Sequence, residues 1–520
     1  MKAVPRVNPN RRAKSGAAPA SASLALHAAH AALARGDWED ARARFDRAIQ
    51  DSPSAEAWEG LAIATSRLDL ADVSLHAREE AFRRYREALD ARGAVRCAVW
   101  LASDVLDFRG DSAVANGWLQ RAQSIIAEVP GPSAEHAFVL TFRAHMTLLA
   151  ENDSVTARRM CTEAIALARQ CGAVDPEMVA LAVEGLAMVM EGHVAEGMSR
   201  LDEATTAAVA GEMHELSLIA TACCILIHAC EQVRDYARAG QWCERVRVLA
   251  ERWRMGNFFV ICRTQYASIL MARGELAAAE AVLTAAMRHA ETHRPALSRS
   301  AVVRMGDLRL RQGRLDEAEA LYQRMGAHPL AVLGRAELAL GTDRVGRVPE
   351  AVDLLEGLLR RIPLSLRAER IRALELISRA YAAARRFDDA QRVVDELTSV
   401  GETVGTDPLR AAASAARGAL LSALGDDGEA RHALEEAVAR YEAGNELFAL
   451  ARTRIALARV LNTLGRRESA LGEATAAAEM LEQMGASLDA RNARELVRTF
   501  TRGARRRRLA APSELSPREL

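Results

Sequence analysis

Small and large apolar residues recur in a fixed frame along most of the chain. Counted from Gly36, the first copy has a large residue at +2 (Trp38), a small one at +5 (Ala41) and an apolar one at +9 (Phe45). Positions +5, +9 and +12 share one face of an α-helix. The frame therefore predicts a helix that packs this face inward, and the similar periodicity before Gly36 predicts a partner helix.

The frame recurs eleven more times, at spacings of 33 to 42 residues that mostly lie near 40. Position +9 is large and apolar, or Cys, in ten of the twelve copies, and the exceptions are Arg78 and Ala474. The further anchors are Asp69, Gly110, Asn152, Gly192, Arg234, Gly274, Gly313, Gly346, Arg385, Gly425 and Gly465. The +5 residues are Ala41, Ser74, Ala115, Ala157, Gly197, Ala239, Ala279, Ala318, Ala351, Ala390, Ala430 and Ala470.

A small +5 residue lets two helices cross closely, and the larger +9 residue fills the space beside the crossing. The anchor stands where the first helix ends and a residue with positive φ favours the turn. About twelve such hairpins predict an all-α fold, an α-solenoid over residues 24–500. We expect the eleven Ala and Gly residues at +5 to carry the repeat packing.

This frame resembles the second helix of a tetratricopeptide repeat, and the resemblance covers about 480 residues. The usual period of that family is about 34 residues. A period near 40 implies longer helices or looser connections than in the standard repeat.

Around the solenoid we expect a disordered basic tail (1–23) and an Arg-rich linker with a further motif (501–520). The short spacing between the anchors Gly313 and Gly346 predicts a bend there. We therefore divide the solenoid into an N-terminal lobe (24–340) and a C-terminal lobe (341–500).

The composition of the chain excludes several classes of protein. The 69 basic and 69 acidic side chains cancel, and lysine occurs only at Lys2 and Lys14. After residue 14 there is thus no lysine for a phosphate-binding loop or a Schiff base. The N-terminus has no apolar signal region, and no apolar run is long enough to span a membrane. The eight cysteines form no Cys-x-x-Cys pair. These features predict a reduced, cytoplasmic protein that is not bound to a membrane.

No catalytic or cofactor motif stands in the sequence, so we expect neither an enzyme nor a cofactor. Cys224 and His228 lie four residues apart and can share a helical face, as zinc ligands sometimes do. A core thiol beside a hydrogen-bonded histidine is the favoured interpretation. We therefore expect no metal site.

Aromatic residues crowd into one stretch of 31 residues in a chain that has few rings elsewhere. Aromatic rings beside arginine make good recognition surfaces, although a thick core layer explains the same pattern. The candidate ligand or partner surface consists of Tyr236, Trp242, Arg245, Trp253, Phe258, Phe259 and Tyr266.

The last residues have a different character. Arg505 to Arg508 close an arginine-rich stretch, and Ser516 to Glu519 form a Ser-x-x-Glu capping box with Pro517 in the first helical position. This predicts the start of a helix at the end of the chain.

The run Leu515, Ser516, Pro517, Arg518 and Glu519 resembles the opening of a LuxR-type helix-turn-helix domain. In that family, helical repeats often precede the DNA-binding domain and are thought to receive a ligand or partner. The recognition helix of the family is absent, so we expect a truncated helix-turn-helix.

The sequence thus favours the sensory, partner-binding arm of a bacterial LuxR-type transcriptional regulator whose DNA-binding domain is missing from this chain. The expected partner is a protein, a peptide or a small-molecule effector on the solenoid, with DNA only if the missing domain is present. The alternative is a stand-alone adaptor without a role at DNA.

Overall fold

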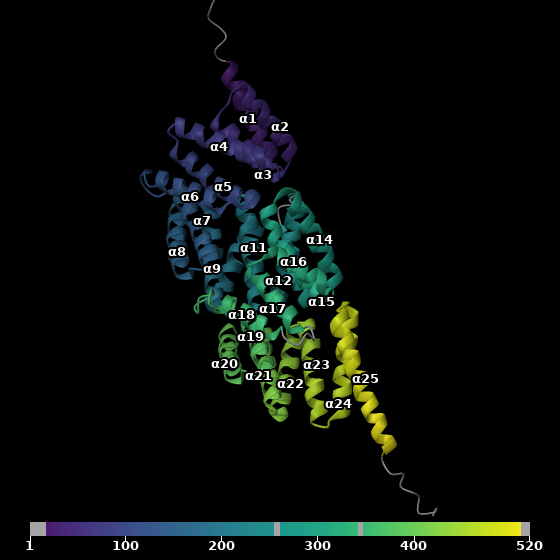
Figure 1. The fold of residues 1–520 in the computed structure, drawn as a ribbon. Coiled ribbons are helices and arrows are strands. Elements are labelled where there is room, and N and C mark those ends of the chain that lie inside the picture. The colour runs from purple at the N-terminus through teal and green to yellow at the C-terminus, as the bar shows by residue number, and fades with distance from the viewer. Residues whose placement is uncertain (1–16, 254–259, 342–346, 511–520) are drawn as a thin grey trace, which may run out of the picture. The chain divides into compact units, whose positions relative to one another are not determined.

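The computed structural model describes residues 17–253, 260–341 and 347–510, and within them it contains α-helices and one short 3-10 helix but no β-strand (Figure 1). This confirms the predicted all-α fold. The helices up to residue 252 are α1 (Ala17–Ala34), α2 (Trp38–Asp51), α3 (Ala55–Arg67), α4 (Ala71–Glu87), α5 (Ala91–Arg109), α6 (Ser112–Ile126), α7 (Ala134–Glu151), α8 (Ser154–Cys171), α9 (Val174–Glu191), α10 (Val194–Ala210), α11 (Leu216–Val233) and α12 (Tyr236–Arg252). The later ones are α13 (Val260–Ala272), α14 (Leu276–His293), η1 (Pro295–Leu297), α15 (Ser298–Arg311), α16 (Leu315–Met325), α17 (Pro329–Gly341), α18 (Val348–Leu359), α19 (Arg367–Ala383), α20 (Phe387–Val404), α21 (Asp407–Leu424), α22 (Asp427–Ala443), α23 (Leu447–Thr463), α24 (Arg467–Met484) and α25 (Ser487–Ala510).

Each of the twelve anchors immediately precedes an even-numbered helix, so the helices pair into hairpins as the frame predicts. Eleven anchors lie in the described residues, and all eleven have positive φ, from 57° to 100°. Four of them are not glycine: Asp69, Asn152, Arg234 and Arg385. Gly346 lies outside the described residues. Asp and Asn adopt positive φ more readily than other non-glycine residues, but the turn geometry also recurs at the two arginines, whose type does not favour it.

An aspartate directly after the anchor caps several of the second helices. The carboxylates of Asp111, Asp153 and Asp426 each accept a hydrogen bond from the backbone N–H three residues further on. Such a cap satisfies one of the free N–H groups of the first helical turn. The anchor and this cap together end one helix and start the next.

Helix length explains the period. Helices α8 to α11 have 17 or 18 residues each. The short spacing between Gly313 and Gly346 coincides with α16 and α17, which have only 11 and 13 residues. A period near 40 thus comes from longer helices.

All twelve +5 residues are buried. At the crossing of α9 and α10, a Cβ atom at Gly197 would lie 2.6 Å from the carbonyl oxygen of Gly185. This crossing has no room for a methyl group. That the other small residues set the crossing distance remains a prediction.

The chain divides into two compact units. Unit 1 contains residues 1–139, 250–258 and 293–296, and unit 2 contains residues 140–249, 259–292 and 297–520. The expected boundary at 340/341 does not separate them, because α17 and α18 on its two sides pack as one hairpin within unit 2.

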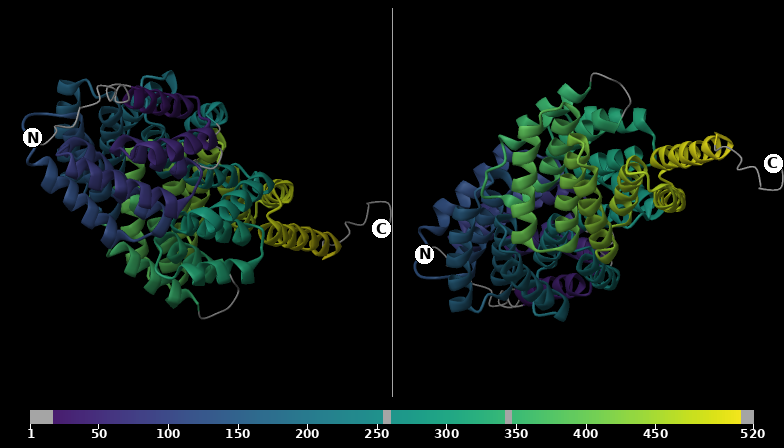
Figure 2. Two further views of the ribbon diagram at one scale, coloured as in Figure 1. Left: turned by 90° about the horizontal axis from the view of Figure 1, so that it is seen from above. Right: turned by 90° about the horizontal axis from the view of Figure 1, so that it is seen from below.

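The ends of the repeat region also differ from expectation. Helix α1 begins at Ala17, so residues 17–23 of the expected tail are helical. Helix α25 continues through Arg505–Arg508 to Ala510, where a linker was expected, and it extends beyond α24 (Figures 1 and 2). Leu515 to Glu519 lie outside the described residues.

Unit 1 shows how an irregular repeat is accommodated. The second hairpin has a serine at +5 and an arginine at +9, and both side chains are buried. Arg78 Nε donates a 2.8 Å hydrogen bond to Asp104 on α5, and Ser74 Oγ lies 3.4 Å from the same carboxylate. The two departures from the frame thus share one buried partner on the next hairpin.

Candidate partner groove and interior arginines

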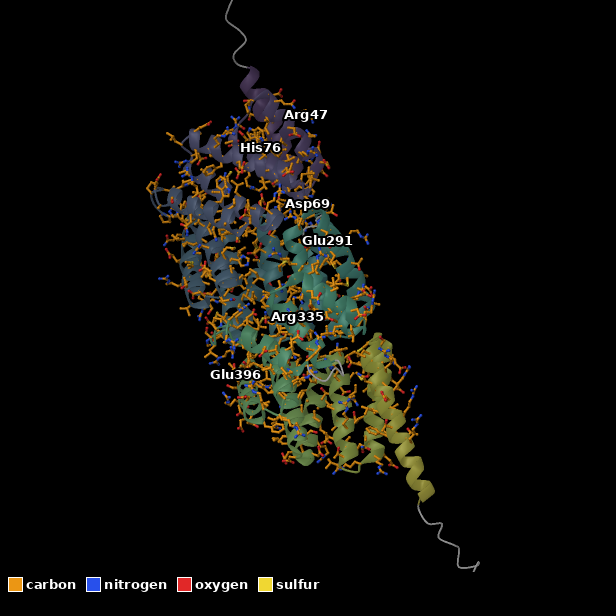
Figure 3. The ribbon with its side chains drawn as sticks, in the orientation of Figure 1. Arg47, Asp69, His76, Glu291, Arg335 and Glu396 are labelled. Carbon is orange, nitrogen blue, oxygen red and sulfur yellow. A yellow bond between two sulfur atoms is a disulfide. The ribbon has the colours of Figure 1, made fainter. Side chains whose placement is uncertain are left out.

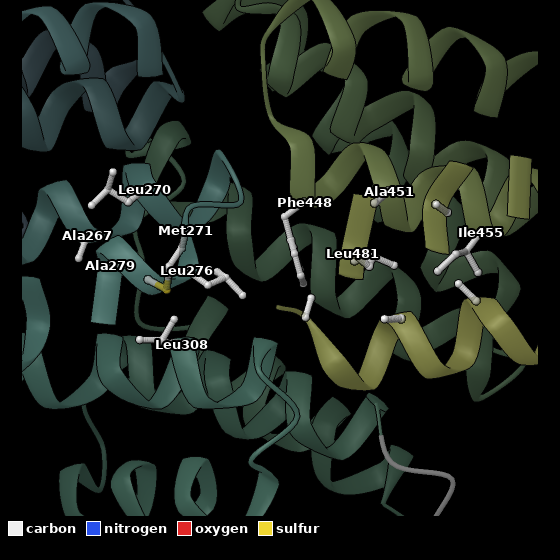
Figure 4. Packing of buried hydrophobic residues seen from close by; sticks show 14 of the residues in the cluster. Ala267, Leu270, Met271, Leu276, Ala279, Leu308, Phe448, Ala451, Ile455 and Leu481 are labelled. Atoms are coloured by element: carbon white, nitrogen blue, oxygen red, sulfur yellow. The ribbon is translucent and has the colours of Figure 1, made fainter. Parts of the chain in front are cut away.

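Unit 2 is wound tightly enough for its own hairpins to meet. Helix α9 contacts α19, α13 contacts α23 and α15 contacts α25, so helices ten elements apart lie against each other. Phe448 and Leu481 share one apolar cluster with Met271, Leu276 and residues around them (Figure 4). Successive turns of this unit therefore bury apolar surface on each other.

The hairpin turns make these contacts. Thr406 Oγ1 donates a 2.8 Å hydrogen bond to the carbonyl oxygen of Val233. Ser487 Oγ donates to the carbonyl oxygen of Gln312. The anchor Gly192 lies against Thr403, because a Cβ there would be 3.2 Å from Thr403 Cγ2. The loops near the hairpin anchors in one winding of the superhelix thus contact the helix ends of the next winding.

Charged side chains on the odd-numbered helices of unit 2, and Arg234 in the turn after α11, form ion pairs that join different hairpins. Arg234 pairs with Glu375 at 2.5 Å and with Glu446 at 3.7 Å. Further pairs are Arg304 with Glu231 at 2.7 Å, Arg372 with Asp307 at 3.6 Å and Arg452 with Glu337 at 2.7 Å.

Other charges pair nearer the surface. Between hairpins, Glu291 on α14 lies 3.5 Å from Arg324 on α16, and an exposed pair of this kind contributes at most about 1 kcal/mol (Figure 3). Within one hairpin, Glu396 on α20 accepts a 2.7 Å hydrogen bond from Arg370 on α19, whose side chain is buried (Figure 3). Neither pair marks a site.

A groove of about 950 Å³ lies over α10 and α12 on the second helices of unit 2. It is lined by Asp202, Thr206, Val209 and Ala210 from α10, and by Asp235, Ala237, Arg238, Gln241, Trp242 and Arg245 from α12 and the residue before it. Its size lies at the upper end of the range for ligand pockets.

Hydrogen bonds fix the groove wall. Trp242 Nε1 donates to Asp202 Oδ1 at 3.1 Å, and Arg238 Nη1 donates to Asp202 Oδ2 at 2.7 Å. Arg238 also pairs with Asp235 at 3.0 Å, so its charge is balanced. The Arg245 guanidinium lies 5.9 Å from the centroid of the Trp242 ring and is exposed. No carboxylate within the described parts of the chain pairs with it.

The structure distributes the seven residues of the candidate surface among different places. Trp242 and Arg245 line the groove. Tyr236 is buried beside the interior pair of Arg234, and Tyr266 packs against the cluster of Figure 4. Trp253 belongs to unit 1, and Phe258 and Phe259 lie outside the described residues. The described residues of the aromatic stretch therefore do not form one surface, and two of them lie in the groove.

The cysteines are not all reduced, although the sequence predicts a reduced protein. Cys224 on α11 and Cys262 on α13 form a disulfide. The two residues are 38 positions apart, close to one repeat period, so neighbouring first helices bring them together. With its sulfur in this bond, Cys224 is not a thiolate ligand for zinc. His228 faces Gln232 at 3.4 Å.

Among the described residues, no group of three or more His, Cys, Asp or Glu side chains is arranged to hold a metal ion. In the same residues α11 is long and apolar enough to cross a membrane, yet 61% of it is buried within the protein. Burial of this kind is typical of a core helix.

The comparisons with known proteins agree with the repeat frame. Residues 26–73 and 266–332 match the family model of the tetratricopeptide repeat. The chain therefore carries tetratricopeptide-type repeats, which confirms that part of the resemblance. No curated protein matches the chain.

Two solved structures align with much of the chain. The crystal structure of a Rap protein complexed with competence and sporulation factor is 12% identical, with a TM-score of 0.42, covering 75% of this chain and 98% of that one. The crystal structure of the APC/C hetero-tetramer Cut9-Hcn1 is 12% identical, with a TM-score of 0.35, covering 89% of this chain and 95% of that one.

Proposed function

We propose that this chain is a non-enzymatic helical-repeat protein that binds a protein or peptide partner in the groove over α10 and α12. The observation that carries the proposal is the pair formed by Trp242 and Arg245 on an open groove of about 950 Å³. Tryptophan and arginine are the residues on which interface binding energy concentrates.

The groove suggests the chemistry of its partner. Arg238 pairs with both Asp202 and Asp235, whereas no carboxylate in the described part of the chain pairs with Arg245. Val209 and Ala210 add apolar surface to the groove that Trp242 lines. A segment that carries a carboxylate next to an apolar side chain matches this arrangement.

Site-specific cross-linking tests this proposal. A photoreactive residue at Gln241, which is exposed in the groove, should cross-link the partner in cells, whereas one at Gln391, exposed on α20, should not. With the purified partner, Trp242→Ala should weaken binding by at least about tenfold, as expected for an interface hot spot. Equal cross-linking at both positions, or unchanged affinity, would contradict the groove as the site.

We also propose that the partner-binding repeats belong to a LuxR-type transcriptional regulator. The support is the motif Leu515 to Glu519, which follows directly after the arginine-rich end of α25. A helix-turn-helix encoded downstream of codon 520 would support this role, and unrelated sequence there would favour the stand-alone adaptor.

A DNA titration adds a second test. The 520-residue chain should bind DNA weakly and without sequence preference, and the affinity should be lost by about 0.2 M salt. Tight, sequence-selective binding would contradict the proposal that the recognition helix lies outside this chain.

A further inference from the structure

Three exposed arginines form a row along helix α25. Arg491, Arg498 and Arg502 follow one another at spacings of seven and four residues. These spacings place the three side chains on one face of the helix, which we call the basic face of α25. At a rise of about 1.5 Å per residue, the row extends over about 16 Å.

The opposite face of α25 is apolar and is already buried. Ala490 and Ala493 belong to the apolar cluster of Figure 4, and Phe500 belongs to a second cluster together with side chains of α23 and α24. This packing fixes the rotation of α25 about its axis. The basic face therefore lies opposite the packed face and stays accessible to solvent.

The arginines of the basic face are not neutralised by their neighbours. In the residues that the structure describes, no carboxylate forms an ion pair with Arg491, Arg498 or Arg502. By contrast, Arg494 on the same helix pairs with Glu482 on α24. The basic face thus presents three positive charges that an anionic partner can balance.

Positive charge is concentrated on this helix. Helix α25 contains eight arginines and two acidic residues, Asp489 and Glu495, although the whole chain has equal numbers of basic and acidic residues. Four of these arginines, Arg505 to Arg508, stand near the end of α25, which extends beyond α24 (Figures 1 and 2). A helix with this charge attracts a polyanion.

A nucleic-acid backbone fits the basic face better than a membrane does. An amphipathic helix binds a membrane by inserting its apolar face, whereas the apolar face of α25 is occupied by α23 and α24. The basic face offers guanidinium groups, which bind phosphate oxygens through two parallel hydrogen bonds. Double-stranded DNA provides phosphates in a dense row, with about one negative charge per 1.7 Å of its axis.

We propose that Arg491, Arg498 and Arg502 on α25 bind the phosphate backbone of double-stranded DNA without reading its sequence. The choice of DNA as the polyanion rests on the LuxR-type role proposed above. The contact itself needs no recognition helix, because phosphates carry no sequence information. It is also separate from the groove over α10 and α12.

The salt dependence of DNA binding by the full chain tests this proposal. The probe is a labelled duplex of about 20 bp and arbitrary sequence, titrated by fluorescence anisotropy between about 50 and 200 mM salt. The triple variant Arg491→Gln, Arg498→Gln, Arg502→Gln should reduce the slope of log K against log salt by about 2.7, because each phosphate contact contributes about 0.9. An unchanged slope would overturn the proposal.

A second triple variant controls for net charge. Arg121→Gln, Arg159→Gln, Arg288→Gln removes three exposed arginines from α6, α8 and α14, so it changes the net charge by the same amount. It should keep the wild-type slope. Both triple variants should keep the wild-type Tm, since they change exposed side chains only. An equal loss of slope in the two variants would show that overall charge, and not α25, determines the binding.

A variant that gains affinity excludes misfolding as the cause. Glu495 is an exposed acidic residue on the basic face. Glu495→Gln should strengthen DNA binding at least about twofold at low salt, because it removes a charge that repels phosphate. The control Glu163→Gln changes an exposed glutamate on α8 and should bind like the wild type. No gain in Glu495→Gln would contradict the basic face as the contact.

The outcomes separate this inference from the proposed regulator role. Absence of DNA binding at about 50 mM salt, or binding to anionic phospholipid vesicles in place of DNA, would overturn the inference. A helix-turn-helix encoded after codon 520 would still support the regulator role in that case. Conversely, DNA binding through α25 with unrelated sequence downstream would support the inference and contradict that role.

Discussion

The backbone of Gly274 lies directly against the side chain of Met484: a Cβ atom at Gly274 would stand 2.6 Å from Met484 Cγ. Gly274 is the anchor of one hairpin, and Met484 ends a helix of the last hairpin five repeats later. The contact is therefore one of the places where successive turns of unit 2 rest on each other.

Gly274→Ala should destabilise the protein by about 2–3 kcal/mol, because it adds strain at positive φ and a clash with Met484. Gly425→Ala is the matched control, since Gly425 also has positive φ but no atom within 4 Å of its Cβ position. It should cost only about 1 kcal/mol. Urea unfolding measures both. Equal losses would show that the contact between turns contributes nothing.

Ala279→Leu should lower the free energy of unfolding by about 1–3 kcal/mol through overpacking of a fully buried position, and the same loss is expected for Ala390→Leu. Ala278 is the adjacent residue on the same helix and is exposed. Ala278→Leu should therefore stay within about 0.5 kcal/mol of the wild type. A tolerated leucine at position 279 would refute the role assigned to the +5 residue.

Asp104→Ala should cost about 3–5 kcal/mol, because it leaves Arg78 buried without its charge partner. The double variant Arg78→Leu, Asp104→Leu removes both charges and should recover much of this loss. Asp40→Ala, which breaks an exposed pair with Arg44 in the same unit, should leave the stability almost unchanged. A double variant no more stable than Asp104→Ala would argue against a pairwise effect.

Acid should remove the contribution of Glu337 to stability. Its pKa in the folded protein is about 2, below the usual 4.5, so its contribution is complete above pH 4.5 and is lost as the pH falls towards 2. The side chain is partly exposed, so the contribution is about 1–2 kcal/mol. The difference in unfolding free energy between the wild type and Glu337→Gln should shrink between pH 5 and pH 3. A difference that stays constant would contradict the lowered pKa.

The disulfide between Cys224 and Cys262 should appear as one linked peptide pair in a non-reducing digest. Closing a loop of this length stabilises a protein by about 3–4 kcal/mol, so Cys224→Ser should lower the Tm. Cys171→Ser changes an exposed free cysteine and should have no effect. Wild-type protein without the linked pair would restore the expectation of fully reduced cysteines.

The repeat frame anticipated the hairpins because it depends on local requirements. A small residue at +5 and a turn-forming anchor mark each second helix, and the anchors within the described residues adopt positive φ. Arg78 does not fit the frame, because position +9 is otherwise mostly apolar. The frame did not explain this residue, since Asp104, which balances its charge, lies in another repeat.

The candidate site was less accessible to sequence reasoning. Trp242 and Arg245 are next to each other on one helix face, so their proximity follows from the local pattern. The interior arginines were not among the predicted site residues. A signal was present, however: Arg304 and Arg311, like Arg372 and Arg379, are seven residues apart on first helices and share one face.

By itself, the sequence determined the all-α class, the recurring hairpins and the position of the turn in each, because helix periodicity and turn geometry involve residues close together in the chain. Only the tertiary structure decided that Arg452 meets Glu337, that Gly274 meets Met484 and that Cys224 meets Cys262. Those contacts depend on how much each hairpin rotates against the next, and small rotations accumulate over five repeats into the winding of unit 2.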